Sequence, residues 1–300
     1  MSLIDDILLA SGKRLAERKQ RFPLAEVQKR AADAPRASVG LLDAVGASAF
    51  SIIAEVKAKS PSSGAMDQKN VGSALETYDA TSSVSAVSIL TDEDYFGGSI
   101  DRLVDARQRT RKPLLRKDFI VDEYQVWEAR AHGADAILLM TDLYLEKPDH
   151  LARIFNLARE LGMDALFELG MKTVVGDIVP KEAVIWGVNS RRFHTTKLQV
   201  RSTIGRLFGT ELSIDSDAHR ELRSQIPDGK LAIAESGIHS QADLGRLFEL
   251  DYRAALIGTA FLKKGANVAS VVAAFDEKVQ RMTSVVRANG LANMANARTA

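Results

Sequence analysis

Short apolar runs alternate with segments of helical spacing along most of this chain. Eight runs have the length and the Val, Ile, Leu and Ala content of buried strands. They lie at residues 52–57, 84–90, 114–117, 136–140, 165–169, 184–188, 231–235 and 254–258. The segments between them predict helices at 72–82, 99–110, 122–132, 149–161, 171–178, 215–224, 240–249 and 267–286.

The alternation predicts an α/β protein in which helices cover a parallel sheet. Eight β-then-α units favour a closed (β/α)8 TIM barrel. An open doubly wound sheet stays as the alternative, because one miscounted strand would allow it. The first fifty residues precede the first strand and have helical patterns broken at Pro23. We therefore expect an N-terminal helical extension at 1–50, the barrel at 51–287 and a frayed tail at 288–300.

Five of the apolar runs end in polar residues that a buried strand rarely holds. Burying a charged group costs several kcal/mol or more unless it is paired or functional. Because the strands of a barrel end at one face, these side chains are expected to share one pocket there. A rim of structural ion pairs is the alternative. The residues are Glu55 and Lys57, Lys117, Glu168, Asn189, and Glu235 with Ser236.

Strand alternation sorts these side chains further. It puts Glu55 and Lys57 on the same face of the first strand, and it lets only one of Arg116 and Lys117 face inward. A lysine flanked by carboxylates from neighbouring strands would stay charged and would suit a positioned general acid.

Two glycine-containing loops indicate a phosphate site. Gly237 follows the seventh apolar run, and Gly258 with Thr259 follows the eighth. Phosphate-binding barrels use backbone N–H groups and a helix N-terminus at this place to hold a dianion.

Composition narrows the class of protein. The 300 residues carry 40 basic and 39 acidic side chains, so no charge excess points to nucleic acid or to a membrane surface. The absence of cysteine excludes disulfides, a thiolate nucleophile and a cysteine-zinc site, and it fits a reducing cytoplasm. No apolar stretch reaches the roughly 18 residues of a membrane span, and the N-terminus lacks the features of a signal peptide.

Several tracts together resemble the indole-3-glycerol-phosphate synthase family. The resemblance runs from about Ser51 to about Gly265, and its motifs occur in the order of the family. The family resemblance implies a (β/α)8 barrel with an N-terminal helical extension. It also implies a reaction that needs no cofactor and no metal. The tracts are IIAEVKAKSPSSG, SILTDEDYFGGS, PLLRKDFIVDEYQVWEARAHGADAILL, WGVNSRRF and IAESGI.

The resemblance implies a substrate and a role for each matching residue. The substrate would be 1-(2-carboxyphenylamino)-1-deoxyribulose 5-phosphate, converted into indole-3-glycerol phosphate, carbon dioxide and water in tryptophan biosynthesis. Lys117 matches the general acid, Glu55 the carboxylate that orients it, and Glu168 the base of the dehydration step. Lys57, Asn189, Arg191 and Glu235 match residues that grip the carboxylate, the anilino group and the hydroxyls. Ser60, Ser236, Gly237, Gly258 and Thr259 match positions near the phosphate.

The chain departs from the family pattern in three places. Gly170 stands where a histidine is expected, the loop after Asn189 is longer, and Thr259 replaces a usual serine. These departures leave open a divergent paralogue that acts on a related aryl-amino sugar phosphate.

Two other classes stay open at this point. An isomerase such as phosphoribosylanthranilate isomerase would share the phosphate loops, but it usually has a cysteine or a histidine at these strand ends. A non-catalytic barrel subunit would tolerate loss of the acid and the base, and this chain keeps both. Association with other tryptophan-pathway enzymes and the oligomeric state do not follow from the sequence.

Overall fold

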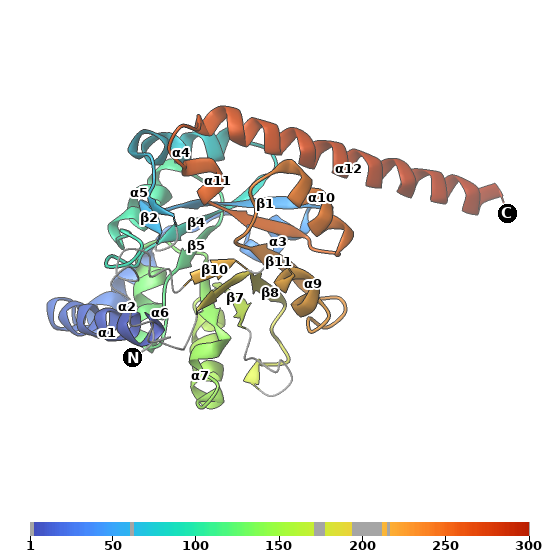
Figure 1. The fold of residues 1–300 in the computed structure, drawn as a ribbon. Helices are drawn as coiled ribbons and strands as arrows, with labels where there is room; N and C mark the ends of the chain where they lie inside the picture. The colour runs from blue at the N-terminus through green and yellow to red at the C-terminus, as the bar shows by residue number, and fades with distance from the viewer. Residues whose placement is uncertain (1–2, 61–62, 171–177, 194–211, 215–216, 300) are drawn as a thin grey trace, which may run out of the picture.

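Eight parallel strands close into a barrel in the computed structural model (Figure 1). The structure describes residues 3–60, 63–170, 178–193, 212–214 and 217–299. The predicted TIM barrel is confirmed, and each strand begins and ends within one residue of its predicted bounds. In their order around the barrel the strands are β1 (Ser51–Val56), β4 (Val84–Leu90), β5 (Leu114–Lys117), β6 (Ala136–Met140), β7 (Asp164–Leu169), β8 (Ile185–Asn189), β11 (Leu231–Glu235) and β12 (Ala254–Ile257).

The strands are apolar on both faces because both faces are buried. Ile53, Leu115, Leu166 and Ile233 belong to the cluster of side chains that fills the barrel, and none of the four is exposed to solvent. Phe50, Val87 and other residues of the larger cluster face the surrounding helices. The barrel is therefore a packed core, and only its ends are available for chemistry.

Helices cover the outside of the barrel. Seven of the eight predicted helices are found, while the one predicted at 171–178 lies almost entirely outside the described residues. A short helix that the sequence did not indicate follows the last strand. The helices after β1 are α4 (Gln68–Ala80), α5 (Asp101–Arg109), α6 (Glu123–Ala131), η1 (Thr141–Leu143), α7 (Pro148–Glu160), α9 (Ala218–Arg223), α10 (Gln241–Glu249), α11 (Thr259–Leu262) and α12 (Val268–Thr299).

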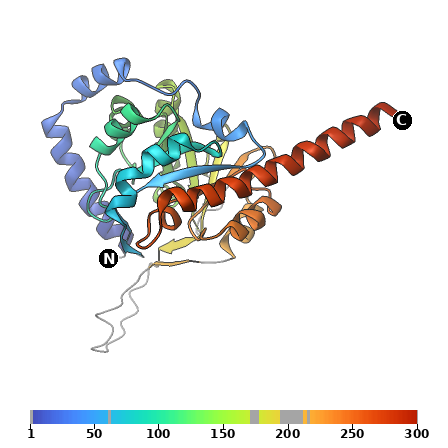
Figure 2. The ribbon, with the colours of Figure 1, turned by 90° about the horizontal axis from the view of Figure 1, so that it is seen from above.

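The predicted N-terminal extension is helical and contacts the barrel in two ways. It contains α1 (Leu3–Arg21), α2 (Leu24–Asp33) and α3 (Leu41–Gly46), with Pro23 between the first two. Helices α1 and α2 lie on one side of the barrel, where α2 packs against α6 (Figure 2). Leu41 and Val45 of α3 join the side chains inside the barrel, so the extension closes the end of the barrel where the strands begin.

The C-terminal segment differs from the predicted frayed tail at 288–300. Helix α12 continues through Thr299 and projects past the barrel (Figure 1). Its first half is held by buried side chains such as Val272, Phe275 and Val279. Ala recurs beyond residue 286, and its high helix propensity favours this continuation. Among the described residues, no helix is both long enough and apolar enough to cross a bilayer.

Two small antiparallel pairs lie in the loops that follow the first and sixth barrel strands. The strand pair β2 (Lys59–Ser60) and β3 (Gly64–Ala65) follows β1, and β9 (Arg191–Phe193) pairs with β10 (Leu212–Ile214) after β8. The long loop noted after Asn189 thus has a paired stem, and its residues 194–211 lie outside the described part of the chain.

Truncating Leu41 is expected to destabilise the barrel. The Leu41 side chain is completely buried, so Leu41→Ala should lower the free energy of unfolding by about 2–5 kcal/mol through lost contacts and a residual cavity. Urea unfolding followed by circular dichroism measures the change. Leu9→Ala is the matched control, because Leu9 is 53% exposed. Equal losses in the two variants would contradict the role of α3 in the core.

Candidate active site

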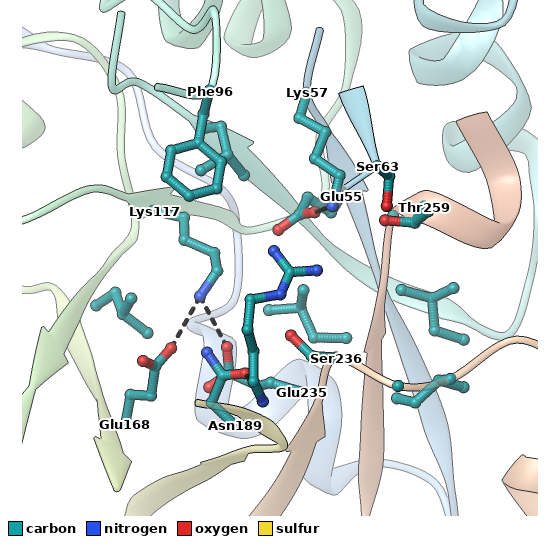
Figure 3. A pocket seen from close by; sticks show the side chains of 18 of the residues that line it. Glu55, Lys57, Ser63, Phe96, Lys117, Glu168, Asn189, Glu235, Ser236 and Thr259 are labelled. Carbon is teal, nitrogen blue, oxygen red and sulfur yellow. Dashed lines mark hydrogen bonds and ion pairs between the residues drawn. The ribbon is translucent and has the colours of Figure 1, made fainter. Parts of the chain in front are cut away.

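A pocket of about 850 Å³, including its open mouth, lies where the barrel strands end (Figure 3). Each of the eight barrel strands, or the loop that follows it, supplies lining residues. The pocket contains nearly all the residues that the sequence indicated: Glu55, Lys57, Lys117, Glu168, Asn189, Arg191, Glu235, Ser236, Gly237, Gly258 and Thr259.

The ammonium group of Lys117 is held between two carboxylates. Its Nζ donates to Glu168 Oε2 at 3.0 Å and to Glu235 Oε2 at 2.8 Å. Burial alone would lower the pKa of Lys117, but Glu168, Glu235 and Glu55 outweigh it and raise that pKa above its usual value. Lys117 is therefore a cation at neutral pH, with a proton directed into the pocket.

Glu55 pairs with Lys57 and not directly with Lys117. Lys57 Nζ donates to Glu55 Oε1 at 2.5 Å, and both side chains are buried. Burial favours the neutral acid, but Lys57 and Lys117 together hold the pKa of Glu55 below its usual value. The hydrogen-bonding partners of Lys117 are Glu168 and Glu235, so Glu55 interacts with Lys117 through charge and not through a hydrogen bond. The orienting role of Glu55 stays a prediction.

Glu235 has an unusual environment for a carboxylate. Its side chain is 1% exposed, and its Oε1 has no hydrogen-bonding partner. Burial raises the pKa of Glu235 most, Lys117 opposes the rise, and neighbouring Glu168 adds to it, with a result of about 8. Glu235 therefore holds a proton at neutral pH.

Two glycines make room for these carboxylates. A Cβ added at Gly187 on β8 would come within 2.1 Å of Glu235 Oε1, and one added at Gly258 would come within 2.3 Å of Glu55 Oε1. Gly187 was not identified from the sequence as a site residue. Its position inside the apolar run VIWGV was the available signal, since glycine inside a strand often marks a close approach.

One side of the pocket is apolar and was also missed. Phe96, Phe119, Leu138 and Met140 line it, and the rings of Phe96 and Phe119 lie 6.3 Å apart between their centroids. Such a wall accommodates a planar ring. The aromatic residues within the DYFGGS and RKDF tracts were the only sequence signal for it.

The opposite side of the pocket has small and polar residues (Figure 3). Ser236 and Gly237 both have positive φ, at 64° and 67°, and this conformation in a non-glycine residue is costly and clusters at functional sites. Gly258 caps the short helix α11 with no side-chain hydrogen bond, and Thr259 begins that helix. This arrangement after the seventh and eighth strands matches the phosphate site of many TIM barrels.

Ser60 does not lie where the sequence placed it. It does not line the pocket, and its hydroxyl instead accepts a hydrogen bond from the backbone N–H of Ser63 at 3.1 Å. Ser63 lines the pocket near Thr259 (Figure 3). The reason is the β2–β3 hairpin, in which Ser60 pairs with Gly64 and its hydroxyl binds within the turn.

Gly170 follows β7 and lies beside Asp142. A Cβ at position 170 would come within 1.9 Å of Asp142 Oδ2, so the carboxylate of Asp142 occupies the space that a larger residue at 170 would need. Neither residue lines the pocket. The change at position 170 therefore leaves the lining of the described pocket intact.

The donor set of the site fits an organic anion better than a metal. Three basic side chains, Lys57, Lys117 and Arg191, line the pocket with the three glutamates. Among the residues that the structure describes, no group of three or more His, Cys, Asp or Glu side chains is arranged to hold a metal ion.

Comparison with known proteins identifies the family. The family model for indole-3-glycerol phosphate synthase matches residues 4–275. The chain belongs to this family. It is 35% identical over 249 residues to the indole-3-glycerol phosphate synthase of Dehalococcoides mccartyi strain CBDB1, covering 82% of this chain and 89% of that protein. It is 36% identical over 267 residues to the enzyme of the same name from a Nocardioides strain, covering 88% of this chain and 95% of that one.

A solved structure supports the fold at much lower similarity. The N-(5'-phosphoribosyl)anthranilate isomerase of Pyrococcus furiosus matches with a TM-score of 0.51 and 9% identity, covering 77% of this chain and 99% of that one. At this identity the match shows the barrel and does not favour an isomerase. Family membership makes the protein an enzyme of tryptophan biosynthesis, a lyase that releases carbon dioxide.

Adding a methyl group at Gly187 is expected to displace the carboxyl group of Glu235. The new Cβ would meet Glu235 Oε1 at 2.1 Å and Leu166 Cδ1 at 3.2 Å. Gly187→Ala should therefore destabilise the protein by about 1–3 kcal/mol and displace Glu235, which thermal unfolding and activity assays would register. Gly72→Ala is the control, because nothing lies within 4 Å of its added Cβ. A Gly187→Ala variant with unchanged melting temperature and activity would refute the close approach.

The protonation of Glu235 predicts how stability varies with pH. Its pKa is raised to about 8 in the folded protein, against about 4.3 for an unperturbed glutamate. The folded state then binds more protons than the unfolded state, so this group's contribution is complete below about pH 4.3 and is lost as the pH rises to about 8. Glu235→Gln should flatten the fall in melting temperature between pH 5 and 8. An identical slope in the two proteins would contradict a protonated Glu235.

Proposed function

We propose that this pocket catalyses the ring closure, decarboxylation and dehydration of 1-(2-carboxyphenylamino)-1-deoxyribulose 5-phosphate to indole-3-glycerol phosphate. The observation that carries the proposal is the Lys117 ammonium, held by Glu168 and Glu235 in a pocket with one apolar side and one side of small polar residues. A substrate with an aryl group at one end and a phosphate at the other matches these two sides.

The substrate is oriented by its ends. The aryl ring lies against Phe119, Leu138 and Met140, and the phosphate lies at the backbone N–H groups around Gly237 and Thr259. Lys57 and Arg191 take the substrate carboxylate. Asn189 Oδ1 already accepts from the backbone N–H of Arg191 at 2.9 Å, so its amide nitrogen is left to bind a substrate hydroxyl.

Ring closure uses the proton of Lys117. The ring carbon that bears the carboxylate attacks the ketone carbon, and Lys117 gives a proton to the ketone oxygen as its negative charge develops. The carbon–carbon bond to the carboxylate then breaks, and carbon dioxide leaves while its electron pair restores the aromatic ring. Lys117 is neutral after this step.

The carboxyl groups beside Lys117 complete the proton balance. Glu235, protonated before the reaction and 2.8 Å from Lys117 Nζ, returns a proton to the lysine. Lys117 then gives this proton to the departing hydroxyl, which leaves as water. Glu168 takes the proton from the adjacent carbon, and the indole forms. Glu168 passes that proton to Lys117 Nζ, 3.0 Å away, which restores the ammonium and the carboxylate. The overall reaction consumes one proton, which solvent restores to Glu235.

A cytoplasmic location is in keeping with a chain without cysteine. Association with other enzymes of tryptophan biosynthesis would bring the product to its next enzyme, and nothing in the described surface specifies such a partner.

Turnover of the carboxyphenylamino deoxyribulose phosphate tests the proposal. Purified protein should produce the indole fluorophore and release one carbon dioxide per product, and it should leave phosphoribosylanthranilate unchanged. A folded protein that turns over only a related aryl-amino sugar phosphate would indicate the divergent paralogue. A folded protein with no turnover of either compound would indicate a non-catalytic barrel.

Loss of the proton donor is expected to reduce kcat strongly. Lys117→Ala should lower kcat by about 100-fold or more, the usual scale for a general acid, and the fluorescence of the product measures it. Lys59→Ala is the control, because Lys59 belongs to the β2–β3 hairpin and does not line the pocket. Near-normal kcat in Lys117→Ala would remove this residue from the role of acid.

A further inference from the structure

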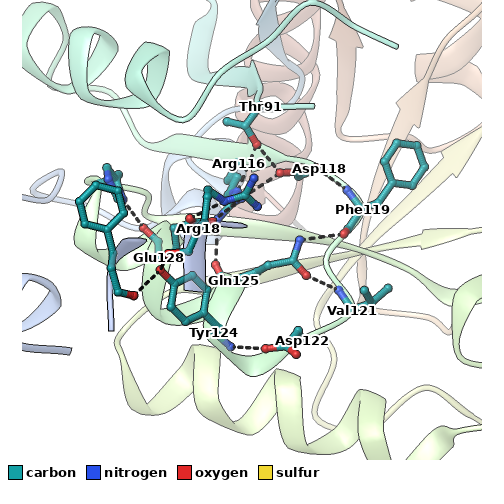
Figure 4. A network of polar contacts seen from close by, with 12 residues as sticks. Arg18, Thr91, Arg116, Asp118, Phe119, Val121, Asp122, Tyr124, Gln125 and Glu128 are labelled. Carbon is teal, nitrogen blue, oxygen red and sulfur yellow. Dashed lines mark hydrogen bonds and ion pairs between the residues drawn. The ribbon is translucent and has the colours of Figure 1, made fainter. Parts of the chain in front are cut away.

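A second group of buried charges surrounds Arg116, the residue before Lys117 (Figure 4). Arg116 precedes Lys117 on β5, and strand alternation turns its side chain away from the pocket, toward α6. The Arg116 side chain is 1% exposed, and its Nη2 donates to Asp118 Oδ2 and to Glu128 Oε2, both at 2.9 Å. Its Nε donates to Thr91 Oγ1 at 3.1 Å, and its Nη1 donates to the carbonyl oxygen of Gln125 at 2.9 Å.

Asp118, which follows Lys117, is held by the same group. Its Oδ2 also accepts from Thr91 Oγ1 at 2.6 Å, and its Oδ1 accepts from the backbone N–H of Phe119 at 2.8 Å. Asp118 borders the pocket, yet both of its oxygens are occupied by these contacts. The backbone N–H of Thr91 donates to the carbonyl oxygen of Lys117 at 3.1 Å. The residues on both sides of Lys117, and its own backbone, are therefore fixed.

The contacts continue into the loop that carries the apolar side of the pocket. Gln125 is fully buried. Its Nε2 donates to the carbonyl oxygen of Phe119 at 3.0 Å, and its Oε1 accepts from the backbone N–H of Val121 at 2.8 Å. The segment from Arg116 to Val121 thus has a single arrangement, with Lys117 and Phe119 turned into the pocket and Arg116 turned away.

Stability alone is a poor reason for this cluster. A buried ion pair is often no more stable than a well-packed apolar group of the same size, because the desolvation of the charges offsets their attraction. A buried, fully bonded guanidinium does fix geometry, because each bond constrains the chain at a different point. Lys117 has a long flexible side chain, and its Nζ must stay within reach of two carboxylates from other strands.

We propose that Arg116 and Asp118 are positioning residues that set the direction of Lys117. This inference rests on the proposed function, in which Lys117 is the proton donor. The two residues act through Lys117 and not on the substrate, so their loss should lower kcat and leave KM nearly unchanged.

A double-mutant cycle tests this role. Asp118→Asn should lower kcat at least tenfold in the wild-type background and change KM less than threefold. In a Lys117→Ala background the same substitution should change the remaining kcat less than twofold, because no positioned acid is left to lose. An equal fold-loss in the two backgrounds, or no loss in the first, would overturn the proposal.

A matched variant separates positioning from general destabilisation. Asp135 forms a buried pair away from the pocket, with Arg107 Nη1 donating to Asp135 Oδ2 at 2.8 Å, and it precedes β6 at the opposite end of the barrel. Asp135→Asn should lower the melting temperature with kcat unchanged. If Asp118→Asn does not fold, Thr91→Val removes only the bridging hydroxyl and should show the same pattern with a smaller loss of kcat.

Crystal structures of the variants make the outcome independent of the reaction. In Asp118→Asn or Thr91→Val, Lys117 Nζ should lose its contact with Glu168 or Glu235. An undisturbed Lys117 would overturn the positioning role even if the wild-type protein is active. A displaced Lys117 in the variants, together with a folded wild-type protein that shows no turnover, would support the positioning role and refute the proposed function.

Discussion

Three titratable groups that meet inside the barrel mouth, the Lys117 ammonium and the carboxyl groups of Glu168 and Glu235, constrain the rest of this structure. Each would be costly to bury alone, so they are tolerated only where they meet. Lys117 is on β5 and Glu235 on β11, four strands apart in the order β5-β6-β7-β8-β11. In a flat sheet that separation would be roughly 19 Å, whereas the observed contact is 2.8 Å. Closure of the barrel is therefore what brings the donor and its partner together.

The neighbouring residues are arranged around this requirement. Gly187 and Gly258 leave space for the carboxylates of Glu235 and Glu55. The Glu55–Lys57 pair adds one charge of each sign beside them. Below the pocket, apolar side chains fill the barrel, and α3 closes its other end. One side of the pocket is apolar and the other has small polar residues. An elongated substrate with one aryl end and one phosphate end therefore binds in one orientation.

Much of this could be predicted from the sequence because it depends on period and order. Buried parallel strands have continuous apolar runs, and strand alternation predicts that only one of Arg116 and Lys117 faces inward, which in the structure is Lys117. Contacts between distant strands have no such local signal. The partners of Lys117, the displacement of Ser60 by Ser63 and the apolar side around Phe96 depend on how loops fold over the barrel. The weak periodicity of residues 288–300 predicts fraying, and recurring Ala residues are the sequence signal for the helix that continues there.

A crystal structure with bound indole-3-glycerol phosphate would show whether the two sides of this pocket orient one substrate about Lys117. The phosphate should lie at Gly237 and Thr259, and the indole ring should lie against Leu138 and Met140. Lys117 Nζ should then lie beside the ring carbon that bears the glycerol chain, because that carbon carried the ketone oxygen. A product bound in the reverse direction, or with Lys117 far from that carbon, would contradict this orientation.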